Sequence, residues 1–190
     1  MGSGGAVGDA IINNPNIHAV SFTGSLPVGR EVAKATAANL VKCQLEMGSK
    51  NALIVAADAD LDVAVNAAFV GAYSGTGQKC TASSRLIVDA SVHDEFVAKL
   101  IAKLETTTVG HALGEGVDLG PVASETQLSE NLAWIEKGKS EGATLAFGGS
   151  RIEAPTGWLR FNAPVVQQEC RTLRRAGLHW RLILAVVIDR

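Results

Sequence analysis

One cysteine, Cys80, lies within a run of small residues, 74–84. Two glycines in this run, Gly75 and Gly77, allow the backbone to bend sharply and to approach a ligand closely. The positive charge of Lys79, or a helix N-terminus nearby, would favour the thiolate, which is the nucleophilic form of cysteine. A cysteine in a loop is more often structural than catalytic, so this run alone leaves both interpretations open.

A second candidate group is the carboxylate of Glu46. Residues 43–46 predict a short buried strand, which the turn 47–50 closes, so the carboxylate is expected at the end of that strand. A carboxylate in this setting is either paired in the core or serves as a general base near neutral pH. Both roles are open from the residue alone.

A third candidate is a turn that could hold a phosphate group. The glycine-rich residues 2–8 precede a helical stretch that ends near Asn13, and residues 18–22 predict a short buried strand. Gly24 and Ser25 then lead into a helix expected over residues 28–39. Helix, strand, turn and helix in this order are typical of a parallel nucleotide-binding sheet. The turn would direct backbone N–H groups and a hydroxyl at a pyrophosphate.

The remaining elements that position these residues also alternate, which predicts an α/β fold. Asp58, Asp60 and Asp62 do not form a calcium loop, because the sixth and twelfth positions of such a loop are not Gly and Glu; they suit the start of a helix. Ser91 is predicted to cap another helix. Ser124 and Gln127 predict a capping box. The expected ranges are strands at 51–56, 85–88 and 143–147 and a loop at 106–124. The expected helices are one that has these aspartates in its first turn and runs to about 73, one that begins at 91, and one that runs from the capping box to about 141.

Composition limits the class of protein. With 47% hydrophobic residues among 190, the chain can form a core, and a net charge of −2 gives no general attraction to nucleic acid or anionic lipid. Three widely spaced cysteines predict neither a disulfide framework nor a zinc site. The first residues do not read as a signal peptide, and the apolar run 182–188 is too short to span a bilayer. We therefore expect a cytoplasmic protein without membrane or nucleic-acid partners.

The segment 167–190 differs from the rest. It holds five of the nine arginines, and no lysine follows Lys139. Because it lacks a clear helical or strand period, we interpret it as sequence outside the fold, such as the product of a reading-frame change. A basic binding tail is the alternative.

Three motifs in this order resemble the NAD(P)-dependent aldehyde dehydrogenase superfamily: Phe22-Thr23-Gly24-Ser25, Leu45-Glu46-Met47-Gly48-Ser49-Lys50 and Gly77-Gln78-Lys79-Cys80. The segments 58–62, 85–88 and 119–121 add to the resemblance, which covers roughly residues 2–166. The run 76–88 is most similar to bacterial members that act on semialdehydes such as 2-oxoglutarate semialdehyde.

The resemblance implies part of the aldehyde dehydrogenase fold. Residues 1–48 would be the end of a Rossmann-like cofactor domain, residues 49–166 the start of an α/β/α catalytic domain, and residues 167–190 an atypical tail. The full-length family is expected to form homo-oligomers, and the implied substrate is a small aldehyde.

The resemblance also implies roles for individual residues. Cys80 matches the nucleophile, with its N–H as one oxyanion donor, and Glu46 matches the general base. The cofactor, NAD or NADP, would lie against the residues Gly4, Gly8, Gly24, Ser25 and Val28, with its nicotinamide end near Met47 and Gly48.

Several departures from the family pattern bear on activity. Ser49 stands where a second glycine is usual and Met47 where leucine is common, and both are tolerable. The family's side-chain oxyanion Asn and adenosine-ribose Lys would precede residue 1, and residues 175–180 lack the Glu-x-Phe ribose clamp. We therefore expect little or no dehydrogenase activity, and poor solubility, from the chain by itself.

Two other functions remain open. A thiol hydrolase would use Cys80 with Glu46 and no cofactor, although the four histidines are not in a triad pattern. An inactive subunit that associates with intact homologues is the non-enzymatic alternative.

Overall fold

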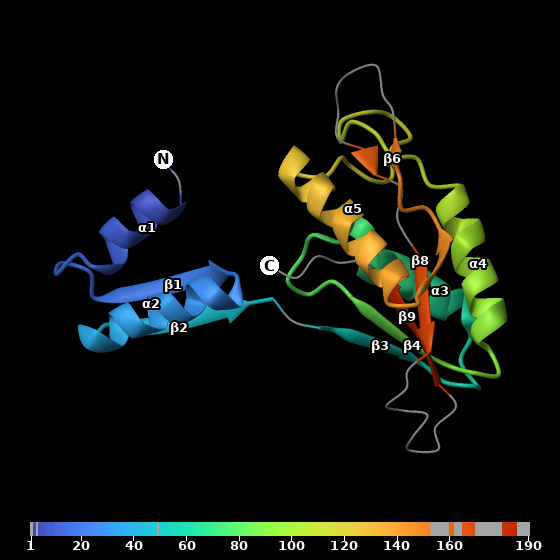
Figure 1. Ribbon diagram of the computed structural model, residues 1–190, viewed down its shortest axis with the longest axis horizontal. Coiled ribbons are helices and arrows are strands. Elements are labelled where there is room, and N and C mark those ends of the chain that lie inside the picture. Colours follow the sequence, from blue (N-terminus) through green and yellow to red (C-terminus); the bar gives the residue numbers. More distant parts are fainter. Residues whose placement is uncertain are drawn as a thin grey trace. The chain divides into compact units, whose positions relative to one another are not determined.

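The computed structural model of the chain describes residues 2, 4–48, 50–152, 160–161, 165–169 and 180–185. These residues divide into two units, one within residues 1–49 and one within residues 50–188, and each is described by itself. The elements of the first unit are α1 (Gly4–Ile12), β1 (Ala19–Gly24), α2 (Leu26–Ala38) and β2 (Lys42–Met47) (Figure 1). The elements of the second are β3 (Ala52–Val55), α3 (Leu61–Ala72), the 3-10 turn η1 (Ser74–Gly77), β4 (Arg85–Asp89), α4 (His93–Glu105), α5 (Glu125–Ser140), β5 (Thr144–Phe147), β6 (Arg151–Ile152), β7 (Arg160–Phe161), β8 (Val165–Glu169) and β9 (Trp180–Ala185).

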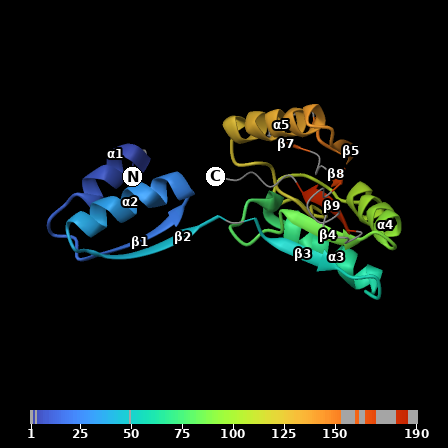
Figure 2. The ribbon, with the colours of Figure 1, turned by 60° about the horizontal axis from the view of Figure 1, so that its bottom comes forward.

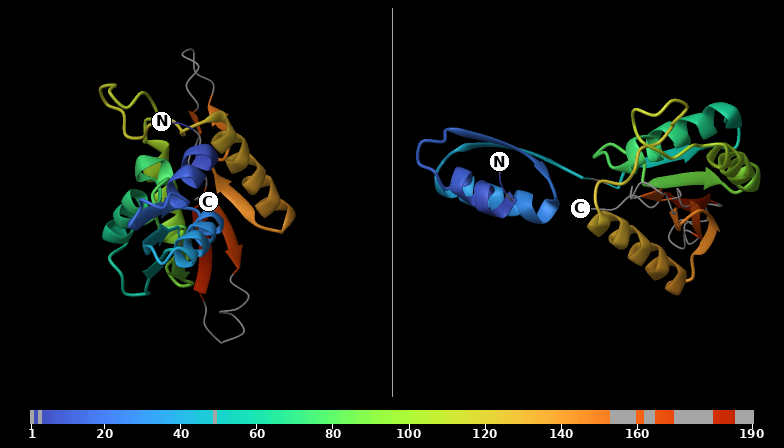
Figure 3. Two further views of the ribbon diagram at one scale, coloured as in Figure 1. Left: turned by 90° about the vertical axis from the view of Figure 1, so that its left-hand side faces the viewer. Right: turned by 90° about the horizontal axis from the view of Figure 1, so that it is seen from above.

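The first unit is a parallel strand pair covered by helices on one face. β1 and β2 pair from Ala19↔Lys42 to Gly24↔Met47, which confirms the predicted parallel sheet. Gly29 allows α2 to pack closely, since a Cβ atom at this position would lie 2.4 Å from Met47 Sδ. α1 lies beside α2 on the same side of the strands (Figures 2 and 3).

Two expectations about the first unit are wrong. α1 already begins at Gly4, so the early glycines are part of the helix and do not precede it. The two strands are also not buried: exposed and half-buried residues alternate along β1, and β2 has no fully buried residue. The reason is that each strand has one neighbour in this unit as described, and helices cover only one face.

The second unit has three layers. Its five-stranded sheet has the order β3-β4-β9-β8-β5, with β3 and β4 parallel and the other pairs antiparallel. α3 and α4 lie on one face of this sheet and α5 on the other (Figures 2 and 3). This arrangement confirms the predicted α/β fold. Parts of the arginine-rich segment, 167–169 and 180–185, lie in β8 and β9, while its origin stays a prediction.

The core of the second unit lies between the sheet and the helix pair α3 and α4. Alternate residues of β4 and one face of α4 are directed into it, as the strand and helix periods require. Its fully buried members are Val55, Val65, Ala68, Ala72, Tyr73, Leu86, Val88, Phe96, Val97, Leu100 and Leu104. α4 is therefore an amphipathic helix whose apolar face contributes to this core.

Side-chain caps mark where two of these helices begin. Asp60 accepts hydrogen bonds from the N–H groups of Asp62 and Val63, so the aspartates start α3 as predicted. Ser124 accepts from the N–H of Gln127 and caps α5, which confirms one half of the predicted capping box, whereas the Gln127 side chain donates to Asn131 Oδ1. The prediction that Ser91 caps α4 is wrong.

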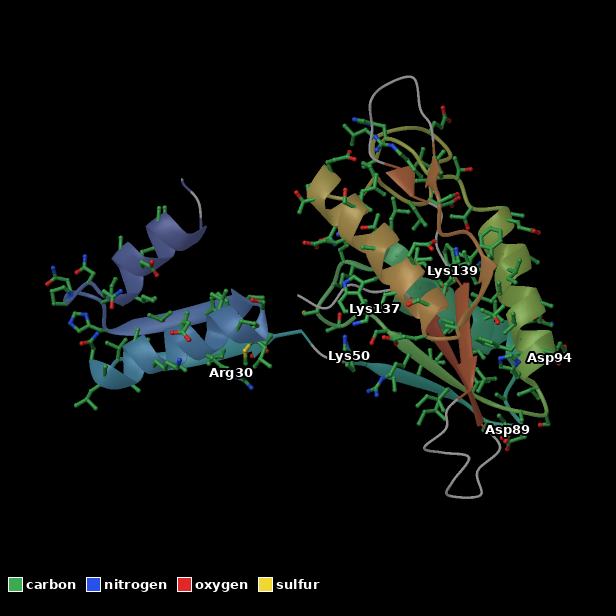
Figure 4. All side chains as sticks on the ribbon, in the orientation of Figure 1. Arg30, Lys50, Asp89, Asp94, Lys137 and Lys139 are labelled. Atoms are coloured by element: carbon green, nitrogen blue, oxygen red, sulfur yellow. The ribbon has the colours of Figure 1, made fainter. Side chains whose placement is uncertain are left out.

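At that position the hydroxyl and the N–H of Ser91 both donate to Asp89 Oδ1. The helix therefore begins at His93, after an N-cap residue, Val92, that has no capping side chain. Figure 4 shows Asp89 near the end of β4 and Asp94 near the start of α4 (Figure 4).

Candidate active site

The carboxyl edge of the β1–β2 pair gathers most of the predicted site residues of the first unit. Because the strands are parallel, Glu46 lies beside Thr23 and Met47 lies beside Gly24. Ser25 follows β1 directly, and Gly48 follows β2 directly. The structure thus brings a general-base candidate, the predicted cofactor turn and the predicted nicotinamide-end residues to one edge of one sheet.

The turn from β1 into α2 has groups that suit a phosphate. Ser25 is the N-cap residue of α2 with extended backbone (φ −77°, ψ 151°), yet its side chain makes no capping hydrogen bond. The first-turn N–H groups of a helix lack partners within the helix and carry partial positive charge. Val28, which is 50% exposed, lies in this first turn. The hydroxyl and the helix end are therefore both available to an anion.

Several of the predicted cofactor residues in this unit are glycines. A Cβ atom at Gly24 would lie 2.5 Å from Phe22 Cζ, so a larger residue there requires the ring to move. In α1, a Cβ atom at Gly4 or Gly8 would meet no atom within 4 Å. α1 leads back to the start of β1, and the N-terminal end of α1 lies toward the carboxyl edge of the strands (Figure 1). The glycines fit a surface that a dinucleotide can approach.

Glu46 is exposed, and the expectation that it ends a buried strand is wrong. Side chains alternate along β2, so Leu45 and Met47 are half-buried while Glu46 faces the opposite way. Gln44 Nε2 donates to Glu46 Oε1 over 3.2 Å on this same face. In this arrangement the carboxylate keeps access to water, as a base that activates water requires.

Cys80 lies in an exposed turn of the second unit. The N–H of Ala82 donates to the carbonyl of Lys79 over 3.0 Å, so Cys80 occupies the second position of this turn. The preceding turn η1 has positive φ angles at Gly75 (62°), Thr76 (60°) and Gly77 (68°). The predicted sharp bend is confirmed, and Thr76 holds a conformation that non-glycine residues seldom adopt.

The N–H of Cys80 makes no hydrogen bond to another residue within the described ranges. The side chain of Lys79 turns back over Gly75, where a Cβ atom would lie 3.8 Å from Lys79 Nζ. The turn therefore presents an exposed thiol next to the Cys80 N–H, and within the described ranges this N–H donates to no other residue.

One residue of this site was missed by reasoning from the sequence. Asn51, which precedes β3, donates from Nδ2 to the carbonyl of Cys80 over 2.8 Å and to the carbonyl of Ala82 over 3.1 Å. The only signal in the sequence is a polar amide at the entrance of an apolar strand, which does not by itself indicate a contact 29 positions away.

Glu46 belongs to the first unit and Cys80 to the second, and each unit is described by itself. No group of three potential metal ligands occurs within the residues described. Nor does any helix in those ranges have the length and apolar character needed to cross a membrane.

Comparison with known proteins agrees with these features. The chain is 47% identical over 152 residues to the alpha-ketoglutaric semialdehyde dehydrogenase of Bacillus subtilis, covering 80% of this chain and 31% of that protein. It is 44% identical over 154 residues to the 2,5-dioxopentanoate dehydrogenase of Saccharolobus solfataricus, covering 80% of this chain and 32% of that protein. The chain thus spans about a third of the length of these curated relatives.

The fold matches solved structures as well. The betaine aldehyde dehydrogenase of Staphylococcus aureus, solved in complex with NAD+, is similar with a TM-score of 0.83 and 34% identity. This match covers 87% of the present chain and 33% of the other. The sequence model of the aldehyde dehydrogenase family matches residues 1–176. The chain therefore belongs to the aldehyde dehydrogenase family.

Proposed function

We propose that the protein oxidises an aldehyde to a carboxylic acid with NAD or NADP, with Cys80 as nucleophile and Glu46 as general base. The observation that carries this proposal is the register of β1 and β2, in which Glu46 and Met47 pair with Thr23 and Gly24 at the end of β1, next to the proposed phosphate-binding turn. A base next to a dinucleotide turn fits a dehydrogenase better than a cofactor-free hydrolase.

The residues of the chain have distinct tasks in this reaction. The Cys80 thiolate attacks the aldehyde carbon, and the oxygen that becomes negative accepts a hydrogen bond from the Cys80 N–H. The hydride of the carbon bonded to sulfur would leave to NAD(P)+, which when bound would supply the two-electron acceptor for this oxidation. The acyl group then remains on Cys80 as a thioester. Glu46 removes a proton from water, which attacks the thioester carbon, and the acid leaves as the sulfur regains its electron pair.

The cofactor would be held by the first unit. The Ser25 hydroxyl and the N-terminal turn of α2 suit the pyrophosphate, and Gly24 permits close approach of the backbone. Gly4, Gly8 and Val28 would flank it, and Met47 and Gly48 would lie at its nicotinamide end. The Staphylococcus aureus relative was solved with NAD+, which supports a nicotinamide dinucleotide as the cofactor.

The proposed substrate is 2-oxoglutarate semialdehyde. The Bacillus subtilis and Saccharolobus solfataricus relatives are named for this compound under its two chemical names, and they share 47% and 44% identity with the chain. Betaine aldehyde is the appropriate comparison substrate, because the Staphylococcus aureus relative is named for it.

The roles of both residues can be tested by trapping the acyl group. The chain is mixed with the semialdehyde and NAD+, quenched in acid and digested with trypsin at mildly acidic pH. Cleavage after Lys79 and Arg85 releases Cys80 as the only cysteine of its peptide, and Cys43 is the only cysteine of residues 43–50. We expect a thioester on Cys80 that requires NAD+ and accumulates further in Glu46→Gln, because removal by water is slowed.

The controls separate the alternatives. p-Nitrophenyl acetate acylates a reactive thiol without any cofactor, because p-nitrophenolate leaves with the electron pair of the ester bond. Acylation of Cys80 by this ester without any NAD+-dependent adduct from the aldehyde would overturn the proposal in favour of a thiol hydrolase. Equal labelling of Cys43 and Cys80 by both reagents would overturn it in favour of an inactive subunit. Steady-state NADH formation separately measures the expected low turnover of the chain by itself.

A further inference from the structure

The entrance to β3 is joined to the cysteine turn by hydrogen bonds from both side chain and backbone. The carboxamide nitrogen of Asn51 donates hydrogen bonds to two carbonyls of the turn, those of Cys80 and Ala82. The carbonyl of Asn51 accepts from the N–H groups of Ser84 (3.0 Å) and Arg85 (3.1 Å). It also lies 3.4 Å from the Ser84 hydroxyl. One residue thus contacts four of the residues from Cys80 to Arg85.

Lys50 extends this junction by one residue. The Arg85 guanidinium donates to the Lys50 carbonyl from Nε over 3.0 Å and from a terminal nitrogen. Lys50 lies two residues before the start of β3 (Figure 4). The strand pairing continues directly from here, with Ala52 opposite Arg85. The cysteine turn is therefore joined to the entrance of β3 by hydrogen bonds of two successive residues, Lys50 and Asn51.

The cysteine itself contributes little to its own placement. Cys80 is exposed, so no apolar packing holds its side chain. Before it, the backbone passes through three consecutive residues with positive φ. Since the direction of the Cα–Cβ bond follows the backbone, the carbonyl of Cys80 is the group through which the thiol can be oriented. Asn51 binds that carbonyl.

We propose that Asn51 is a positioning residue for Cys80: its carboxamide holds the Cys80 and Ala82 carbonyls and thereby fixes the direction of the thiol and of the Cys80 N–H. This inference rests on the proposed function, in which both groups act on the substrate. Asn51 does not contact the reacting atoms. Its effect is to keep the nucleophile and the oxyanion donor in one geometry, because a preorganised donor needs no rearrangement during the reaction.

Two substitutions remove the contact in different ways. Asn51→Asp keeps the size of the side chain but replaces the donor with an acceptor that repels both carbonyls. Asn51→Ala removes the donor without repulsion, and it is the variant to use where Asp prevents folding. The matched control is Asn131→Ala, which deletes another side-chain amide of the second unit, the one that accepts from Gln127 Nε2 over 3.2 Å. That residue lies on α5 and is 5% exposed.

The first measurement is hydrogen exchange of the amides of residues 78–84 in the full chain. We expect exchange there to rise about fivefold to tenfold in Asn51→Ala, and more in Asn51→Asp, as the loss of one or two hydrogen bonds implies. Asn131→Ala should leave these amides unchanged while it raises exchange within α5. No rise in Asn51→Ala, or an equal rise in the control, would overturn the proposal.

The second measurement is the ratio of acetylation of Cys80 to that of Cys43 by p-nitrophenyl acetate, with Cys43 as the reference within the same molecule. We expect this ratio to fall about fivefold in Asn51→Ala and to be unchanged in Asn131→Ala. A ratio that stays constant while exchange rises would show that Asn51 orders the turn without orienting the thiol, which overturns the inference. If Cys80 in the unaltered chain reacts no faster than Cys43, the proposed function fails, and hydrogen exchange alone then decides whether Asn51 holds the turn.

Discussion

Gly29 is the position at which the smallest change should disturb the cofactor edge. It lies in α2 and is buried against the strands. A Cβ atom there would lie 2.4 Å from Met47 Sδ, 3.3 Å from Met47 Cγ and 3.5 Å from Phe22 Cε1. In Gly29→Ala the thioether must therefore move by roughly 1 Å to reach an ordinary van der Waals distance. Met47 is a proposed nicotinamide-end residue, so the displacement affects the proposed site itself.

Two effects of opposite sign compete in this variant. Replacing glycine by alanine inside a helix stabilises by about 1 kcal/mol. Inserting a methyl group into a packed contact costs about 1–3 kcal/mol. Gly29→Ala should therefore range from neutral to about 2 kcal/mol destabilised. Gly8→Ala is the matched control, because it is also helical and its Cβ meets nothing within 4 Å. It should be stabilised by about 1 kcal/mol.

The assay must report on the first unit alone. All three tryptophans lie beyond residue 130, so tryptophan fluorescence follows the second unit. Hydrogen exchange of peptides from α2 and β2 gives the free energy of opening of the first unit directly. If Gly29→Ala raises this free energy as much as Gly8→Ala does, α2 is not packed on Met47 and the reasoning is refuted. Loss of the penalty in a Met47→Ala background would identify the thioether as the atom responsible.

Further predictions concern the second unit. Asp60→Ala should lose about 1 kcal/mol of unfolding free energy in urea because two N–H groups of α3 lose their acceptor, whereas Asp58→Ala should change it little. Phe96→Ala should cost about 3–5 kcal/mol in the same titration because Phe96 is fully buried, while Leu113→Ala, at a residue 90% exposed, should be near neutral. Burial raises the pKa of Tyr73, the only tyrosine. Its phenolate absorbance should therefore appear with unfolding, and stability should fall above about pH 10, where the unfolded chain releases the proton first.

Features determined within one turn of helix could be predicted from the sequence. The starts of α3 and α5 follow from Asp60 and Ser124, whose side chains reach N–H groups two or three residues ahead. The prediction that Ser91 caps α4 is wrong because of another contact between residues close in sequence. Its hydroxyl has a competing acceptor two residues earlier, Asp89 Oδ1, and such a contact competes with capping.

Burial could not be predicted in the same way. The apolar residues of β1 and β2 indicate strands, and the structure has them, but exposure depends on what lies beside and above each strand. With one partner strand each and helices on one face, Glu46 is exposed. Asn51 was missed for a related reason, since its partners Cys80 and Ala82 are 29 and 31 positions away. No period or cap relates residues at such distances.

The connection between Asn51 and Cys80 depends on strand register. Asn51 directly precedes β3, and the cysteine turn leads into β4. Because these strands are parallel with Ala52 opposite Arg85, both entrance segments lie at the same edge of the sheet. A slip of one residue would shift the entrances by about 3.3 Å and reverse the side chains of one strand, which breaks both carboxamide hydrogen bonds. Substitutions that weaken the β3–β4 pairing should therefore alter the reactivity of Cys80 through Asn51, although they lie on strands and not in the cysteine turn.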